Sequence, residues 1–172
     1  MSNKLSIESL GSGYVQVFSF CRAEALGKKP QVGTSDILLA IVKKAGDNCM
    51  LTGRPIKNKE LQLLRSLGIT HHKQLYVQLK INMREQRERG LPRLDGAKMS
   101  CSANFSHVVL LATKIAKLWG YKKLNSGILL TALVKLQRGI AYNELKHFKL
   151  SLKELKKATL EIWEPSKESQ RG

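Results

Sequence analysis

Histidine and cysteine side chains are the first candidates for chemistry in this sequence, as metal ligands or as nucleophiles. His71 and His72 are adjacent, and adjacent residues on a helix point about 100° apart, so the two imidazoles cannot face one metal ion. His107 and His147 stand alone. Cys21 has no histidine near it in sequence that could act as its base. We therefore expect no metal site, no cofactor and no enzymatic activity.

Positive charge is the dominant compositional feature. Lysine and arginine number 30 against 13 acidic residues, a formal net charge of +17. The excess is spread along the chain, with +7 over residues 1–83 and +8 over residues 104–172, which is unlike a basic tail. A cationic surface attracts acidic proteins, nucleic acids or membranes. Aromatic residues are not interleaved with the lysines for base stacking, so an acidic protein is the expected partner and nucleic acid the alternative.

The sequence has no pattern typical of export or of ATP hydrolysis. Its first ten residues lack the basic and apolar regions of a signal peptide, and no run approaches roughly eighteen apolar residues. The three cysteines, Cys21, Cys49 and Cys101, are too few and too far apart for a disulfide framework. No G-x-x-x-x-G-K-[ST] segment occurs. We expect a cytoplasmic protein, or a stromal one if it is a processed plastid protein, with no membrane partner.

The chain contains an internal repeat. Residues 12–27 and 105–120 have equal length and match, at a shift of 93, at three pairs of positions: Val15 and Val108, Ala23 and Ala116, Gly27 and Gly120. Residues 34–43 align with 126–135 at a shift of 92, and Leu64 aligns with Leu145 at a shift of 81. The first copy therefore carries about eleven extra residues near 49–58, where Gly53 and Pro55 predict an exposed loop.

Apolar residues at helical spacing predict an all-α fold of eight helices. The predicted helices span residues 12–26, 34–45, 58–67, 70–83, 105–119, 126–136, 139–148 and 151–163. Thr34 and Ser126 are the expected N-caps of two of them, and Ser151 with Glu154 has the spacing of a capping box. Polar residues with Gly90, Pro92 and Gly96 predict a linker between the copies. The predicted organisation is a first repeat at 12–83, a linker at 84–104, a second repeat at 105–163 and a disordered tail at 164–172.

The order and spacing of these elements resemble the repeat of the Clp N-terminal domain. The resemblance is carried by GTSDILLAI at 33–41 and LGI at 67–69 in the first copy, and by RGIA at 138–141 with Leu145, Phe148 and Leu150 in the second. It covers roughly residues 12–163 and implies two four-helix repeats related by pseudo-twofold symmetry.

The resemblance also implies a function. Domains of this family dock adaptors and substrates at the front of AAA+ unfoldases, and they also occur as free accessory proteins of the Clp protease. We therefore expect a non-enzymatic accessory or adaptor protein, whose partners are Clp ATPase or protease subunits, adaptors or substrates. The alternatives are the substrate-docking domain of a longer Clp ATPase and a basic helical nucleic-acid-binding protein.

The expected binding surface lies at the turn that enters the second helix of each copy. Free backbone N–H groups and nearby lysines there would favour an acidic partner segment. The candidate residues are Thr34, Ser35 and Asp36 with Lys28 and Lys29 in the first copy, and Ser126 and Gly127 with Lys122 and Lys123 in the second.

Further features of these turns qualify that expectation. Some family members bind phosphoarginine through a glutamate in this turn, but Ser35 and Gly127 occupy the matching positions and cannot supply that charge. Lys43 and Lys44 form another pair at a helix end, where cations are also favourable simply because of the helix dipole. Trp163, at the end of the last helix, is equally suited to core packing and to partner contact.

Overall fold

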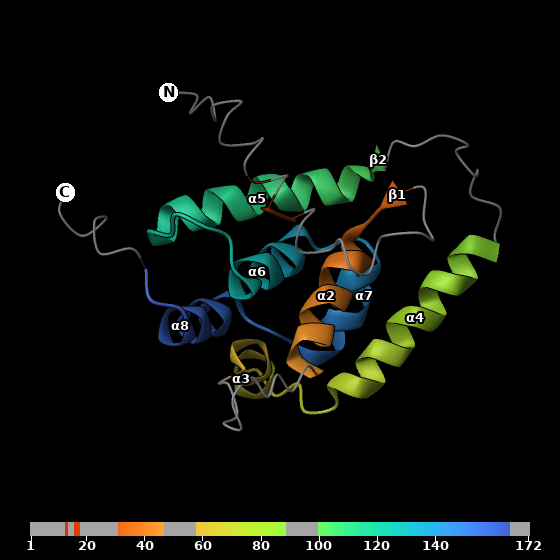
Figure 1. Ribbon diagram of the computed structural model, residues 1–172, viewed down its shortest axis with the longest axis horizontal. Coiled ribbons are helices and arrows are strands. Elements are labelled where there is room, and N and C mark those ends of the chain that lie inside the picture. Colours follow the sequence, from red (N-terminus) through yellow and green to blue (C-terminus); the bar gives the residue numbers. More distant parts are fainter. Residues whose placement is uncertain (1–12, 14–15, 18–30, 47–57, 89–99, 166–172) are drawn as a thin grey trace, which may run out of the picture.

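The computed structural model describes residues 13, 16–17, 31–46, 58–88 and 100–165 (Figure 1). The regular elements of the described chain are helices except for one parallel pair of two-residue strands, β1 (Gln31–Val32) and β2 (Ser100–Cys101). The helices are α2 (Thr34–Gly46), α3 (Lys59–Ser66), α4 (His72–Glu88), α5 (Ala103–Trp119), α6 (Ser126–Leu136), α7 (Ile140–Leu145), the 3-10 turn η1 (Lys146–Phe148) and α8 (Leu152–Ile162). The predicted all-α class is confirmed.

The two helices with the most continuous apolar sequence, α2 and α6, form the interior. All residues from Thr34 to Val42 and from Ser126 to Leu133 are buried. A helix that is apolar on every side must be covered on every side. Accordingly α2 contacts α3, α4, α6 and α7, whereas α6 contacts α5, α7 and α8 as well as α2 and α3. Figure 1 shows α2 at the centre, with α5 crossing one side and α4 flanking another.

Several predicted boundaries were wrong. Helix α4 continues to Glu88, past the predicted end at residue 83, because residues 84–88 are good helix formers and include no glycine or proline. Helix α5 begins earlier than predicted, at Ala103, because the Ser102 hydroxyl accepts a hydrogen bond from Phe105 N at 3.1 Å. Both ends of the predicted 84–104 linker are therefore helical.

Other predicted segments fall wholly or partly outside the described residues. Of the predicted first helix, 12–26, only Gly13, Gln16 and Val17 are described, and they are helical. Of the predicted loop, only its last residue is described, and Asn58 is the N-cap of α3. The predicted helix over 139–148 is instead the short α7 followed by η1. Residues 166–172 of the predicted tail also lie outside the described part.

The predicted N-caps Thr34 and Ser126 are each the first residue of their helix, one position after an N-cap. In α6 the N-cap is Asn125, whose Oδ1 accepts a hydrogen bond from Ile128 N at 2.9 Å. Helix α2 begins at Thr34, and the residue before it, Gly33, donates its N–H to Asp36 Oδ2 at 2.9 Å. Asparagine and glycine are also good N-cap residues. The hydroxyl residue that follows each of them, Thr34 or Ser126, is therefore the first residue of the helix. The capping box of Ser151 and Glu154 is confirmed.

The first turn of α6 is in very close contact with α8. A Cβ atom added to Gly127 would lie 2.3 Å from Thr159 Oγ1 and 2.7 Å from Thr159 Cγ2. The Thr159 hydroxyl is itself fixed, because it donates to Leu155 O at 2.7 Å and is fully buried. The absence of a side chain at Gly127 therefore sets how closely these two helices pack.

Candidate functional site

Most of the predicted first-turn residues are inside the protein. Thr34, Ser35 and Asp36 are at most 4% exposed, and Ser126 is 2% exposed. Gly127 is buried beneath Thr159. These residues are covered because α2 and α6 are the central helices, and of them only Ser126 also lines a pocket. Lys28 and Lys29 lie outside the described residues.

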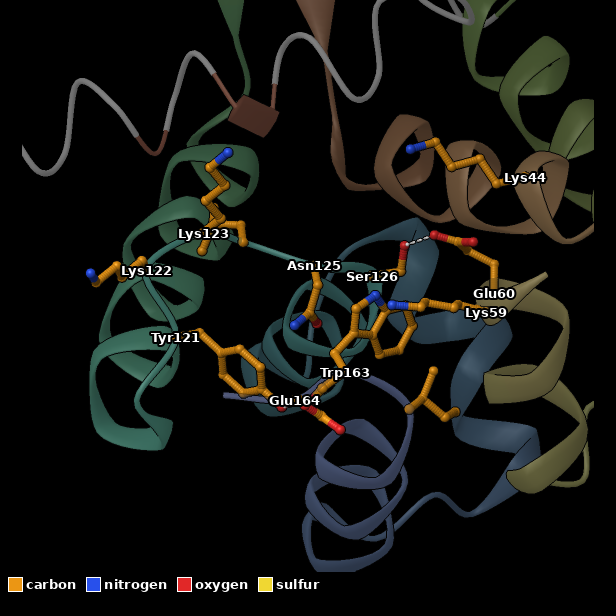
Figure 2. A pocket seen from close by; sticks show the side chains of 12 residues that line it. Lys44, Lys59, Glu60, Tyr121, Lys122, Lys123, Asn125, Ser126, Trp163 and Glu164 are labelled. Carbon is orange, nitrogen blue, oxygen red and sulfur yellow. Dashed lines mark hydrogen bonds between the residues drawn. The ribbon is translucent and has the colours of Figure 1, made fainter. Parts of the chain in front are cut away.

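A pocket of about 780 Å³ nevertheless lies at the predicted turn of the second copy (Figure 2). We call it the cationic pocket. It is bounded by the end of α2, the start of α3, the turn between α5 and α6, and the end of α8. Its lining residues are Lys44, Lys59, Glu60, Tyr121, Lys122, Lys123, Leu124, Asn125, Ser126, Ile162, Trp163 and Glu164. Lys122, Lys123 and Ser126 of the predicted turn thus lie in one pocket with residues from three other helices.

The lysines lie on two sides of the cationic pocket, and in Figure 2 the Lys59 ammonium group points toward Trp163 whereas those of Lys122 and Lys123 point outward. Figure 2 shows Lys44 and Lys59 on one side of Trp163, and Lys122 and Lys123 on the other. All four lysine side chains are exposed. An ammonium group offers three hydrogen-bond donors and no acceptor, so a set of four attracts carboxylates or phosphates. The arrangement favours a ligand whose negative charges lie at its two ends.

Two glutamates reduce this positive charge within the cationic pocket. Glu60 is held in place, because its Oε1 accepts a hydrogen bond from Ser126 Oγ at 2.8 Å. This bond also joins the first turns of α3 and α6 (Figure 2). Glu164 is exposed at the end of α8. The pocket is therefore cationic at its rim but not uniformly so.

An aromatic pair forms another wall. The Tyr121 hydroxyl donates to Trp163 O at 2.5 Å and lies 3.3 Å from Thr159 O. This contact ties the turn between α5 and α6 to the end of α8. Trp163 is partly buried and packs against the hydrophobic core, as do Leu124 and Ile162. Trp163 therefore packs on the core, one of the two roles considered for it, and also lines the pocket; its contact with a partner stays a prediction.

The Tyr121 contact leads to a prediction about stability and pH. Tyr121→Phe should lower the free energy of unfolding by about 0.5–1.5 kcal/mol at pH 7, because a partly buried hydrogen bond is lost. Burial raises the pKa of Tyr121 above its ordinary value of 10.0, so the fold favours the neutral phenol. That contribution is present below pH 10 and is lost as the pH rises through the raised pKa.

Urea unfolding at pH 7 and at pH 11, followed by circular dichroism, measures this effect. The stability gap between wild type and Tyr121→Phe should be smaller at pH 11. Tyr142→Phe is the matched control, because Tyr142 lies on α7 and does not line the cationic pocket. Equal stability of wild type and Tyr121→Phe at pH 7 would show that the contact contributes nothing.

Among the described residues, the side chains first considered for chemistry are not grouped, and Cys21 lies outside those residues. Within the described ranges, no three His, Cys, Asp or Glu side chains are placed to hold a metal ion. His71 is exposed, and His107 Nδ1 lies 3.2 Å from an Arg138 guanidinium nitrogen at the surface. No described helix is long and apolar enough to cross a lipid bilayer.

Sequence reasoning missed Lys59 and Glu60 as site residues. Both belong to α3, which is more than sixty residues from Ser126 in the chain. The available signal was that Asn58 and Asn125 are both good N-cap residues, and they are the N-caps of α3 and α6, although they do not align with each other in the repeat. It indicates two similar helix starts but not that they meet.

The comparisons with known proteins add no relationship to this picture. No family model matches the chain, and no curated protein sequence is significantly similar to it. The class of protein is therefore defined by the structure, as an all-α protein with two buried central helices and a cationic pocket where four elements meet.

Proposed function

We propose that this chain is a non-enzymatic protein-binding module of the Clp N-terminal type, acting as an accessory or adaptor protein of a Clp-type chaperone or protease. In this proposal two four-helix repeats, related by pseudo-twofold symmetry, hold the cationic pocket. The pocket binds an acidic segment of the partner.

The pattern of helix contacts supports the two-repeat arrangement. Exchanging α2 with α6, α3 with α7 and α4 with α8 converts one observed contact into another. The contact of α2 with α4 becomes that of α6 with α8, and α2 with α3 becomes α6 with α7. Between the repeats, α2 with α7 becomes α6 with α3, and α3 with α8 becomes α7 with α4. Such correspondence is expected of two copies packed about an approximate twofold axis.

A shared turn gives independent support. Gly68, after α3, has φ 78°, and Lys149, which aligns with it at the shift of 81, has φ 50°. A positive φ is ordinary for glycine but uncommon for lysine. A lysine in this conformation indicates that the turn geometry is imposed by the packing of the helices on either side. The same geometry in both copies is what a structural repeat requires.

The cationic pocket is the observation that carries the proposed binding. Lys122 and Lys123 were expected at a docking turn, and the pocket places Lys44 and Lys59 opposite them. Lysines on one surface are most often only solubilising. Four of them around a pocket that also has an aromatic wall form a site with both charge and shape.

Affinity capture tests the proposal. The full chain, immobilised and exposed to extract from its own cells at physiological salt, should retain a Clp ATPase subunit, protease subunit or adaptor, identified by mass spectrometry and then confirmed with the purified component. Retention of RNA or DNA with no Clp component would favour the nucleic-acid alternative. Reading the gene beyond the codon for Gly172 distinguishes an accessory protein from the docking domain of a longer Clp ATPase, which would continue into a Walker motif.

A further inference from the structure

We infer that the cationic pocket selects a partner segment in which one bulky apolar side chain is flanked on both sides by carboxylates, with the Trp163 indole as the platform for the apolar side chain. This inference rests on the proposed function and specifies the chemistry of the acidic segment.

The lining of the cationic pocket is divided into a charged rim and an apolar wall. The four rim lysines are exposed, whereas Tyr121, Leu124, Ile162 and Trp163 are only partly exposed and pack against the core. Partly exposed apolar surface within a pocket gains free energy when a ligand covers it. A purely acidic segment would leave this wall in contact with water. A segment with one large apolar side chain would cover it.

The two glutamates discriminate against a uniformly charged ligand. Glu60 cannot easily turn away, since Ser126 Oγ binds its carboxylate at 2.8 Å. A polyanion, such as a nucleic acid or a run of glutamates, would place negative groups beside Glu60 and Glu164. Such like-charge contacts cost binding energy. A ligand with a neutral centre and acidic ends avoids them and still meets the lysines on both sides.

The position of Trp163 is fixed before any ligand binds. Its carbonyl oxygen accepts the hydrogen bond of the Tyr121 hydroxyl, and its side chain packs on the core. A platform that is already ordered loses little conformational entropy on binding. Tryptophan is also the residue type most enriched among energetically dominant contacts. The pocket volume of about 780 Å³ accommodates a leucine or phenylalanine side chain together with neighbouring peptide groups.

The test uses fluorescence of Trp163 in a Trp119→Phe background, which leaves one tryptophan in the chain. Three peptides with blocked ends are titrated: Glu-Asp-Leu-Glu-Asp, the same peptide with serine in place of leucine, and the same peptide with its acidic residues replaced by their amides. The leucine peptide should shift the Trp163 emission and bind about tenfold more tightly than either of the others. A single-stranded oligonucleotide should bind more weakly than the leucine peptide.

Two variants separate a platform from a merely structural role. Trp163→Ala should weaken binding of the leucine peptide about tenfold and leave binding of the serine peptide unchanged. Fluorescence anisotropy of each dye-labelled peptide measures these affinities. Glu60→Gln, whose amide oxygen can keep the hydrogen bond from Ser126, should strengthen binding of the oligonucleotide severalfold more than binding of the leucine peptide. Circular dichroism of each variant checks the fold, and the Glu60→Gln result does not depend on Trp163→Ala folding.

Other results would contradict either the apolar platform alone or the proposed docking as well. If the leucine and serine peptides bind equally well, recognition is electrostatic only; this inference is then wrong, although the proposed docking of an acidic segment stands. Tighter binding of the oligonucleotide than of any peptide would overturn both. The absence of binding by every acidic peptide would also overturn both.

Discussion

Replacing both Lys122 and Lys123 with glutamate should weaken capture of the Clp partner about tenfold or more at physiological salt. The double substitution removes two cations from the rim of the cationic pocket and places two anions there. An exposed ion pair contributes about 0.2–1 kcal/mol, and a new like-charge contact costs a comparable amount. Over two positions these terms total about 0.8–4 kcal/mol, and the middle of this range exceeds the roughly 1.4 kcal/mol that corresponds to a factor of ten in affinity. Affinity capture and titration of the purified partner measure the change.

The matched control is Lys153→Glu with Lys157→Glu. Both lysines are exposed on α8 and do not line the cationic pocket, and their reversal changes the net charge by the same amount. This control should bind nearly as well as wild type, and helical circular dichroism should be unchanged in both double variants. Rising salt concentration should weaken binding of the partner to the wild type. It should also reduce the difference in affinity between the wild type and Lys122→Glu with Lys123→Glu. Intact capture by Lys122→Glu with Lys123→Glu, or equal loss in the control, would show that the pocket is not the docking site.

Gly127→Ala should lower the free energy of unfolding by about 2–4 kcal/mol. The new Cβ would lie 2.3 Å from Thr159 Oγ1, far inside van der Waals contact, at a position buried between α6 and α8. Either α8 must move or Thr159 must rotate and give up its hydrogen bond to Leu155 O. Urea unfolding followed by circular dichroism measures the loss of stability. Since α8 carries Trp163 at its end, the same substitution should also distort the cationic pocket.

Two further variants identify the cause of that loss. Combining Gly127→Ala with Thr159→Ala removes the two nearest atoms but leaves Thr159 Cβ, 2.9 Å away, so the double variant should lose less stability than the sum of the singles. Gly46→Ala is the matched control, because its Cβ would meet no atom closer than 4.0 Å and should change stability by no more than about 1 kcal/mol. If the losses of stability caused by Gly127→Ala and Thr159→Ala were strictly additive in the double variant, steric contact would not be the cause.

The buried helices were predictable because their signal is local. Residues 34–45 and 126–136 were expected to be helical, and α2 and α6 span Thr34–Gly46 and Ser126–Leu136. Nearly unbroken apolar sequence between polar turns requires a helix that is covered on all sides, whatever its neighbours are. Caps were less predictable, because Asn125 and Ser126 are both acceptable N-caps and only the path of the incoming chain selects one of them. The end of α4 was also less predictable. Its last residues, up to Glu88, are charged or polar, so the spacing of apolar residues did not mark them as helical.

By itself, the sequence determined the all-α class, the positive charge and the pair of lysines before Ser126, since each of these is a property of nearby residues; the two-repeat organisation stays a prediction. Only the tertiary structure decided which residues share the pocket. Lys44, Lys59 and Trp163 come from three helices that meet the turn between α5 and α6. The approach of α8 to α6, set by Gly127 and Thr159, places Trp163 there. Local residue patterns hold no information on how helices cross, because crossing depends on side-chain packing between segments far apart in the chain.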